Sequence, residues 1–359
     1  MIKKAIIFSL VFLSFNAVSY TQVRKYSNEF LSIGIGARSL GMANSVVASE
    51  KEVTAGYWNP TGLLHLDHDL QLGAMHAEYF AGIAKYDYGA VGFSLSDVSA
   101  FGVSVIRFGV DDIPNTLELI DSDGNIRYDR IKSFSAADYA FLFSYAREHP
   151  KEGLSYGGNV KIIHRIAGEF ASAWGFGLDA AARFYYKNWI FSGIARDVTS
   201  TFNAWKFNTG ELEEVFLLTG NEIPSNSLEI TVPKLILATA YNYQISNKFG
   251  LLAEVDFDCT FDGKRNVVIK GDFMSVDPHL GLEFDYNKLV YFRMGIGNFQ
   301  EIPGFDNSKE LSFQPNLGLG IRYKKLALDY ALTDIGDNSI ALYSNVFTLM
   351  WAIDKEENL

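Results

Sequence analysis

Acidic side chains at every second position are the densest potential chemistry in this sequence. Glu254, Asp256 and Asp258 alternate with apolar residues, and Glu283 and Asp285 repeat the spacing later in the chain. Successive side chains of a β-strand point to opposite faces, so this spacing puts the carboxylates on one face. Carboxylates crowded on an enclosed face need countercharge or water. The other charged residues that the alternation assigns to such a face are Asp179, Arg183, Arg293 and Arg322.

Catalytic and metal-binding patterns give no comparable signal. The sequence has no G-x-S-x-G, H-E-x-x-H, phosphate-loop or dinucleotide motif, so we predict no enzymatic activity and no cofactor. Cys259 is the single cysteine, which excludes an internal disulfide and a cysteine-based zinc cluster. His65 and His68 lack further ligands nearby, so we predict exposed turn histidines rather than a metal site.

Residues 121–125 (DSDGN) resemble a calcium-binding loop in their oxygen content. Their order breaks the spacing of the helix-loop-helix calcium site, and no glutamate follows at the required place. Asp-Gly is also a common hairpin-turn dipeptide. A turn is therefore the favoured interpretation, and calcium binding stays open as the alternative.

Composition limits the class of protein. The 359-residue chain has 31 basic and 42 acidic residues, a formal net charge of -11, which argues against nucleic-acid binding. It is rich in glycine (31), phenylalanine (28) and tyrosine (19), whereas charged residues make up only 20%. A mean hydropathy of +0.04 is too low for a helical membrane protein. The composition therefore favours β-structure with a partly apolar exterior.

The N-terminus has the features of a secretory signal peptide over residues 1–19. Lys3 and Lys4 precede an apolar run over residues 5–15, and Ala17-Val18-Ser19 fits the small-x-small cleavage rule. A membrane-spanning helix needs about 20 apolar residues, and this run is shorter. We therefore predict that the chain is exported.

Long segments with period-2 alternation occupy most of the chain after residue 67. In 174–186, for example, aromatic or other apolar residues take every even position. A soluble sandwich and a transmembrane barrel both produce this pattern. The segments are longer than the about 5–6 residues typical of soluble strands. Aromatic residues also cluster at segment ends, as at Tyr185-Tyr186, which favours the barrel.

We therefore predict an all-β fold, a fourteen-stranded antiparallel transmembrane β-barrel over residues 67–353. Connections after even-numbered strands are short, whereas the long ones follow odd-numbered strands, which puts both termini and a tail over 354–359 on the periplasmic side. The predicted strands are 70–80, 83–95, 99–109, 135–147, 154–166, 170–186, 188–199, 231–244, 248–261, 273–286, 289–298, 310–324, 325–333 and 340–353.

Residues 22–66 lack alternation and are too many for a simple tail, so we predict a compact hatch in the barrel lumen. Arg38 would anchor this hatch to the acidic wall, because buried charges are normally paired. Trp58, Asn59 and Pro60 could form a gate. Asn-Pro favours a turn, however, and Trp58 would pack within the hatch, so the structural role is the favoured one.

Two blocks of the predicted hatch, residues 30–43 (FLSIGIGARSLGMA) and 57–63 (YWNPTGL), resemble the N-terminal signature of the PorV/PorQ family. Shorter fragments over 86–90, 101–105, 112–116, 134–138 and 232–234 extend the likeness over most of the chain. The resemblance implies a fourteen-stranded barrel with an N-terminal hatch in the bacterial outer membrane. Members of this family serve type IX secretion beside the translocon, and the larger FadL-like group moves hydrophobic molecules through a hatch-gated lumen.

This resemblance favours a non-enzymatic accessory of protein secretion or outer-membrane assembly, with membrane lipid and subunits of such a complex as partners. Its contact surface would be the loops 110–134, 200–230 and 299–309. The alternative is FadL-like transport of hydrophobic small molecules, with a lipid or detergent in the lumen. The acidic lumen favours the first function, because an apolar ligand prefers an apolar pocket. Partner-binding candidates in the second loop are Phe202, Trp205, Phe207, Phe216 and Leu217.

Overall fold

The computed structural model describes residues 28–121, 123–210, 213, 222, 225–303, 309–333, 335 and 343–354. The predicted signal peptide therefore lies outside the described residues. The strands are β1 (Leu70–Tyr79), β2 (Ala84–Ser96), β3 (Ser99–Asn115), β4 (Lys132–Glu148), β5 (Leu154–Ala167), β6 (Ala171–Tyr186), β7 (Trp189–Arg196), β8 (Phe202–Phe207), β9 (Ser227–Ile230), β10 (Lys234–Gln244), β11 (Phe249–Thr260), β12 (Ser275–Tyr286), β13 (Val290–Pro303), β14 (Lys309–Tyr323), β15 (Leu326–Thr333) and β16 (Ser344–Ile353).

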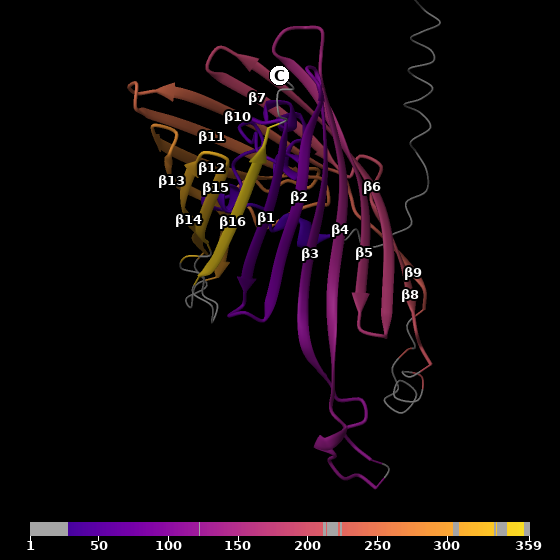
Figure 1. Ribbon diagram of the computed structural model, residues 1–359. Helices are drawn as coiled ribbons and strands as arrows, with labels where there is room; N and C mark the ends of the chain where they lie inside the picture. The colour runs from indigo at the N-terminus through magenta and orange to yellow at the C-terminus, as the bar shows by residue number, and fades with distance from the viewer. Residues whose placement is uncertain are drawn as a thin grey trace, which may run out of the picture.

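The sheet closes on itself because its first and last strands pair. β1 and β16 are antiparallel, with Leu70 opposite Ile353. β7 and β8 both pair with β6, so they are two pieces of one barrel strand. β9 pairs with β8 and β10 with β7, so these two form the next barrel strand. Sixteen elements therefore make fourteen barrel strands, and the predicted fourteen-stranded antiparallel barrel is confirmed (Figure 1).

The break between β7 and β8 corrects one part of the prediction. We expected 200–230 to be a loop, but β8 and β9 extend the barrel wall into it. Between the pieces, Asp197 and Ser200 adopt positive φ angles of 57° and 58°, which interrupts the ladder. A period-2 pattern cannot be followed across such a break, so the prediction ended the strand at residue 199.

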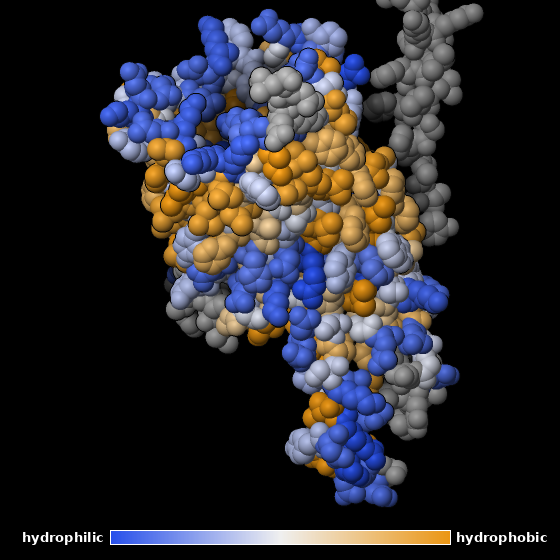
Figure 2. Space-filling view, in the orientation of Figure 1, coloured by the Kyte–Doolittle hydropathy of each residue, from blue (hydrophilic) through white to orange (hydrophobic). Residues whose placement is uncertain are grey.

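The outside of the barrel is apolar. Along β16 buried and exposed residues alternate without exception, and the exposed ones include Phe347 (52%), Leu349 (52%) and Trp351 (51%). Figure 2 shows a hydrophobic belt across the visible face, with polar surface above and below it. This arrangement is typical of a barrel wall that contacts hydrocarbon.

No helix in the described part of the chain is long and apolar enough to cross a membrane.

Residues 28–66, here called the luminal segment, run inside the barrel. They form only short helices, η1 (Glu29–Ser32), α2 (Ala37–Gly41), α3 (Ala55–Trp58) and η2 (Pro60–His65). Ile35, Met42 and Val47 are wholly buried, at 0% exposure. Glycine in the wall leaves room for the luminal segment, since a Cβ at Gly295 would lie 2.2 Å from the backbone carbonyl carbon of Met42. The segment thus fills the lumen where it contacts the wall.

The two rims of the barrel differ. The start of β1 and the end of β16 share one rim with tight turns such as Lys324-Lys325, and we call it the short-turn rim. The opposite rim, the long-loop rim, carries the connections 116–131, 208–226 and 261–274. β3 and β4 project past this rim as a hairpin that includes η3 (Tyr128–Arg130) (Figure 1).

If the barrel wall is embedded in lipid, a charged side chain on its outer face should lower the stability more at the bilayer midplane than near a rim. Leu349→Arg, in the middle of β16, should destabilise the protein by about 2–4 kcal/mol in phospholipid bilayers, because arginine is costly at the bilayer midplane. The matched change Leu326→Arg, beside the short turn, should cost about 0–1 kcal/mol. Urea unfolding in bilayers measures both. Equal, small costs at the two positions would contradict a membrane-embedded wall.

Candidate functional site

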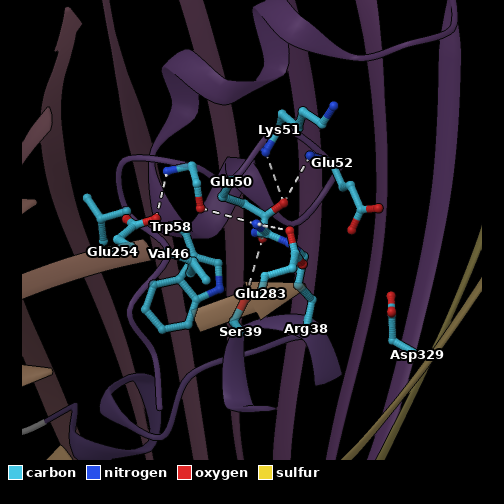
Figure 3. A network of polar contacts seen from close by, with 12 residues as sticks. Arg38, Ser39, Val46, Glu50, Lys51, Glu52, Trp58, Glu254, Glu283 and Asp329 are labelled. Atoms are coloured by element: carbon cyan, nitrogen blue, oxygen red, sulfur yellow. Dashed lines mark hydrogen bonds and ion pairs between the residues drawn. The ribbon is translucent and has the colours of Figure 1, made fainter. Parts of the chain in front are cut away.

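Arg38 links the luminal segment to the barrel wall. Its Nε donates to Oε2 of Glu283 on β12 at 2.9 Å, and its Nη1 lies 3.1 Å from Oε2 of Glu50 in the luminal segment. α2 brings Arg38 to this wall because the helix packs against β13 to β16. Figure 3 shows the three side chains pointing toward one another. The Arg38 side chain is only 8% exposed, so its charge is neutralised by protein rather than by bulk water.

Two wall arginines extend these contacts into one network. Arg293 of β13 pairs with Glu283, and its Nη1 lies 2.6 Å from Oδ1 of Asp329 on β15. Arg322 of β14 lies 2.8 Å from Asp329 and 2.7 Å from Glu52 of the luminal segment. Removing one partner of such a buried pair leaves an uncompensated charge. The arginine network, as we call it, consists of Arg38, Arg293, Arg322, Glu50, Glu52, Glu283 and Asp329.

The carboxylates of β11 have a different partner. Glu254 accepts hydrogen bonds from the backbone N–H groups of Ala48 and Ser49 at 2.6 and 3.1 Å. One oxygen of Asp256 accepts those of Val46 and Val47, both at 3.1 Å. The two acids therefore hold four consecutive backbone amides, which sequence analysis did not anticipate because it looked for basic side chains.

Arg183 of β6 holds the same stretch from its carbonyl side. Its Nη2 donates to the carbonyl oxygens of Val47 and Glu50 at 3.3 and 2.8 Å. Asp179, four residues earlier on the same face, instead forms a buried ion pair with Nζ of Lys161 at 2.8 Å. The backbone around residues 46–50 is thus bound by both its donors and its acceptors.

Two of the predicted lumen acids lie away from these contacts. Asp258 pairs with Lys234 toward the long-loop rim. Asp285 accepts the backbone N–H of Lys288 at 3.1 Å in the turn between β12 and β13. The predicted acidic cluster is therefore divided among a backbone-binding pair, the arginine network, an ion pair and a turn.

The Trp58-Asn59-Pro60 run makes structural contacts. Trp58 Nε1 donates to the carbonyl oxygen of Ile35 at 2.9 Å. Asn59 donates through Nδ2 to Val47 at 3.0 Å and caps η2, in which Pro60 is the first residue. These contacts account for the three residue types by packing and turn formation. A gating role for them remains a prediction.

Several residues of the site escaped sequence analysis. Arg196 of β7 lies with its guanidinium carbon 4.3 Å from the ring centroid of Tyr57, and it donates to the Tyr57 carbonyl oxygen. Asp329 could have been found, because on β15 it alternates with Leu328 and Tyr330 as the other lumen charges alternate with apolar residues on their strands. Lys161 could have been found in the same way, because it lies between Val160 and Ile162 on β5. Glu50 and Glu52 lie outside the strands and carry no such signal.

The predicted partner-binding aromatic residues belong to the barrel wall rather than to a loop. Phe202, Trp205 and Phe207 lie on β8, and Trp205 Nε1 donates to Glu229 of β9 at 3.0 Å. Their predicted place in a loop was wrong for the same reason as the strand boundary, whereas their role in partner binding stays a prediction. Phe216 and Leu217 lie outside the described residues.

The histidine and calcium candidates have local explanations. His65 is not an exposed turn residue as predicted, because its ring packs edge-on against Tyr185 with 4.9 Å between centroids. His68 pairs with Asp354 at 2.6 Å. Asp121 Oδ1 accepts the backbone N–H groups of Asp123 and Asn125, which is a turn contact. Among the described residues no group of three potential ligands could hold a metal ion.

A cavity of about 520 Å³ lies between the luminal segment and the long-loop rim. Residues of β10 to β14 form one side of it, and residues of β1 and β3 form another. Its size falls in the range of about 300–1,000 Å³ that is usual for small-molecule sites. The luminal segment is its floor, contributing Ile33, Leu40 and Asn44 among others.

The arginine network predicts that loss of Arg38 loosens the luminal segment. Arg38→Met should destabilise it by about 3–5 kcal/mol, because the buried Glu50 loses its paired cation and Glu283 keeps only Arg293. The exposed Arg127, which pairs with Asp129, is the matched control, and Arg127→Met should cost at most about 0.5 kcal/mol. Limited proteolysis of residues 28–66 measures the effect, and wild-type resistance in Arg38→Met would refute the anchoring role.

Because of His65, we expect the stability of the luminal segment to depend on pH. Burial, followed by the positive charges of Arg183 and Lys51, lowers the pKa of His65 from 6.5 to about 4. Because the unfolded chain binds the proton more tightly, its contribution to stability is present above pH 6.5 and is lost between pH 6.5 and 4. The proteolysis rate of the luminal segment should rise over this window. His65→Gln should remove part of that rise, and an unchanged pH profile would exclude His65 as its source.

Comparison with known proteins supports the architecture. No protein-family model and no curated protein sequence matches the chain. The toluene transporter TodX of Pseudomonas putida has a TM-score of 0.55 at 12% identity, over 90% of this chain and 99% of that one. A FadL homologue of Pseudomonas aeruginosa gives 0.51 at 12% identity, over 88% and 97% of the two chains. The toluene transporter TbuX of Ralstonia pickettii gives 0.50 at 11%, over 89% and 98%. This chain therefore has the fold of the FadL-like barrels.

Proposed function

We propose that this protein is an outer-membrane channel that admits small, largely apolar molecules from the long-loop side into its lumen. The cavity above the luminal segment is the observation that carries the proposal, because a closed barrel offers a ligand of this size a site there. Two of the similar structures, TodX and TbuX, are described as toluene transporters. This agrees with the transport alternative better than with a secretion accessory.

The luminal segment would control passage beyond the cavity. Val53 lies against Gly73 of β1, and Leu63 lies against Gly92 of β2 and Gly102 of β3, so the segment also contacts the wall below the cavity. A molecule moving from the cavity toward the short-turn rim must therefore pass or displace it. In this proposal the short-turn rim, where β1 begins and β16 ends, faces the periplasm, as in other barrels with short periplasmic turns.

An accessory role in secretion is the second candidate, and the β3–β4 hairpin favours it. Ile120, Ile126 and Tyr128 near its tip are 66%, 57% and 71% exposed. Exposed apolar residues on a projecting hairpin suit contact with another protein. Affinity purification from the native membrane tests this role, and recovery of translocon or assembly subunits that a Tyr128→Ser variant loses would support it. The PorV/PorQ resemblance remains a prediction.

Locking the luminal segment to the wall tests the channel. A Cβ at position 73 would lie 2.6 Å from Cγ1 of Val53, so Val53→Cys with Gly73→Cys can form a disulfide. The pair is made in a Cys259→Ala background and oxidised with copper phenanthroline. We expect uptake of the apolar dye N-phenyl-1-naphthylamine by intact cells to fall about tenfold and to recover with dithiothreitol, because passage requires the segment to move.

The reduced form is the internal control for folding, and Val53→Cys alone is the control for oxidation. If the disulfide forms completely and dye uptake stays at the wild-type rate, the luminal segment does not control passage.

A further inference from the structure

We propose that the cavity binds neutral amphipathic molecules, in which an apolar body carries an uncharged hydrogen-bonding head such as a hydroxyl or amide group. This inference rests on the proposed function and narrows its substrate class. It follows from the way in which polar and apolar residues are divided between two sides of the cavity.

One side of the cavity is aromatic. Tyr79 at the end of β1, Phe80 in the following turn and Phe108 of β3 line it. Phe108 packs edge-on against Tyr86, with 5.8 Å between the ring centroids, which fixes its position. Ile33 of the luminal segment continues this surface onto the floor. An aromatic ring or short alkyl chain would lose its contact with water here.

The opposite side, formed by β10 to β14, is polar. The strand order around the barrel separates these strands from β1 and β3 through β15 and β16. Asn316 is the polar residue chosen for a test, because it lines the cavity, is only 8% exposed, and has an Oδ1 without a hydrogen-bond partner among the described residues. The polar residues on this side include Lys234, Asp258, Thr260, His279, Gln314 and Asn316.

The basic side chains on the polar side already have acidic neighbours. Lys234 pairs with Asp258, and Arg265 lies 2.9 Å from Asp262. Nε2 of His279 lies 3.7 Å from Asp277, a contact that is an ion pair only when the histidine is protonated. A charged head group would therefore have to compete with existing partners in a confined space. A hydroxyl or amide can exchange hydrogen bonds with the same groups without that cost.

Four probes with one body and different heads test this inference: 3-phenyl-1-propanol, propylbenzene, 3-phenylpropanoate and 3-phenylpropylamine. Isothermal titration calorimetry of the purified barrel in detergent measures their affinities. We expect the alcohol to bind at least tenfold more tightly than each of the other three. Propylbenzene binding as tightly as the alcohol would overturn the inference, and so would preferred binding of either charged probe or no binding of the alcohol.

Two substitutions test which part of the ligand each side of the cavity binds. Asn316→Leu, which keeps the number and branching of the side-chain heavy atoms, should reduce alcohol binding to the level of propylbenzene, whereas Phe108→Ala should weaken the two probes by similar factors. Asn345→Leu, on the exposed face of β16, is the matched control and should leave both affinities unchanged. Equal alcohol affinity in Asn316→Leu and wild type would overturn the assignment.

The dye uptake measured above is independent of these affinities. Normal uptake with no preference for the alcohol would refute the substrate class and leave the channel intact. If the proposed channel function is wrong, dye uptake will instead be the same with and without the disulfide between positions 53 and 73.

Discussion

Backbone groups that belong to neither helix nor strand impose the main constraint on this barrel. A chain of irregular structure inside a confined lumen must find partners for its N–H and C=O groups, since unpaired buried groups are costly. Glu254 and Asp256 accept the amides of residues 46–49, and Arg183 donates to the carbonyl groups beside them. The position of the luminal segment and the floor of the cavity both depend on these contacts.

The arginine network adds a second level of attachment. Arg38 and the pair Arg322–Glu52 connect the luminal segment to β12, β14 and β15. Both sets of contacts are polar, and polar contacts can be exchanged for water or for other polar groups more readily than a packed apolar core can be opened. A segment held in this way can be rigid at rest and still move, as the proposed channel function requires.

The sequence predicts the barrel well because its main physical requirement is simple. A wall between lipid and lumen needs only alternation, so β16 is recognised directly from its residues. The prediction failed where the backbone departs from this rule, as at Asp197 and Ser200. It also missed the partners of Glu254 and Asp256, because a backbone amide has the same chemistry in every residue type. Because the wall requires only this alternation of residue types, a similar fold can occur in a chain with 12% identity.

The divided strands also affect how the barrel responds to mechanical load. Among the described strands β9 pairs only with β8, so its other edge forms no backbone hydrogen bonds with β11. The end of β13 beyond Gly297 is held on one side in the same way, because it pairs only with β14. Tension in the surrounding bilayer would therefore act first on these one-sided strand ends, each of which has a single neighbour to resist it.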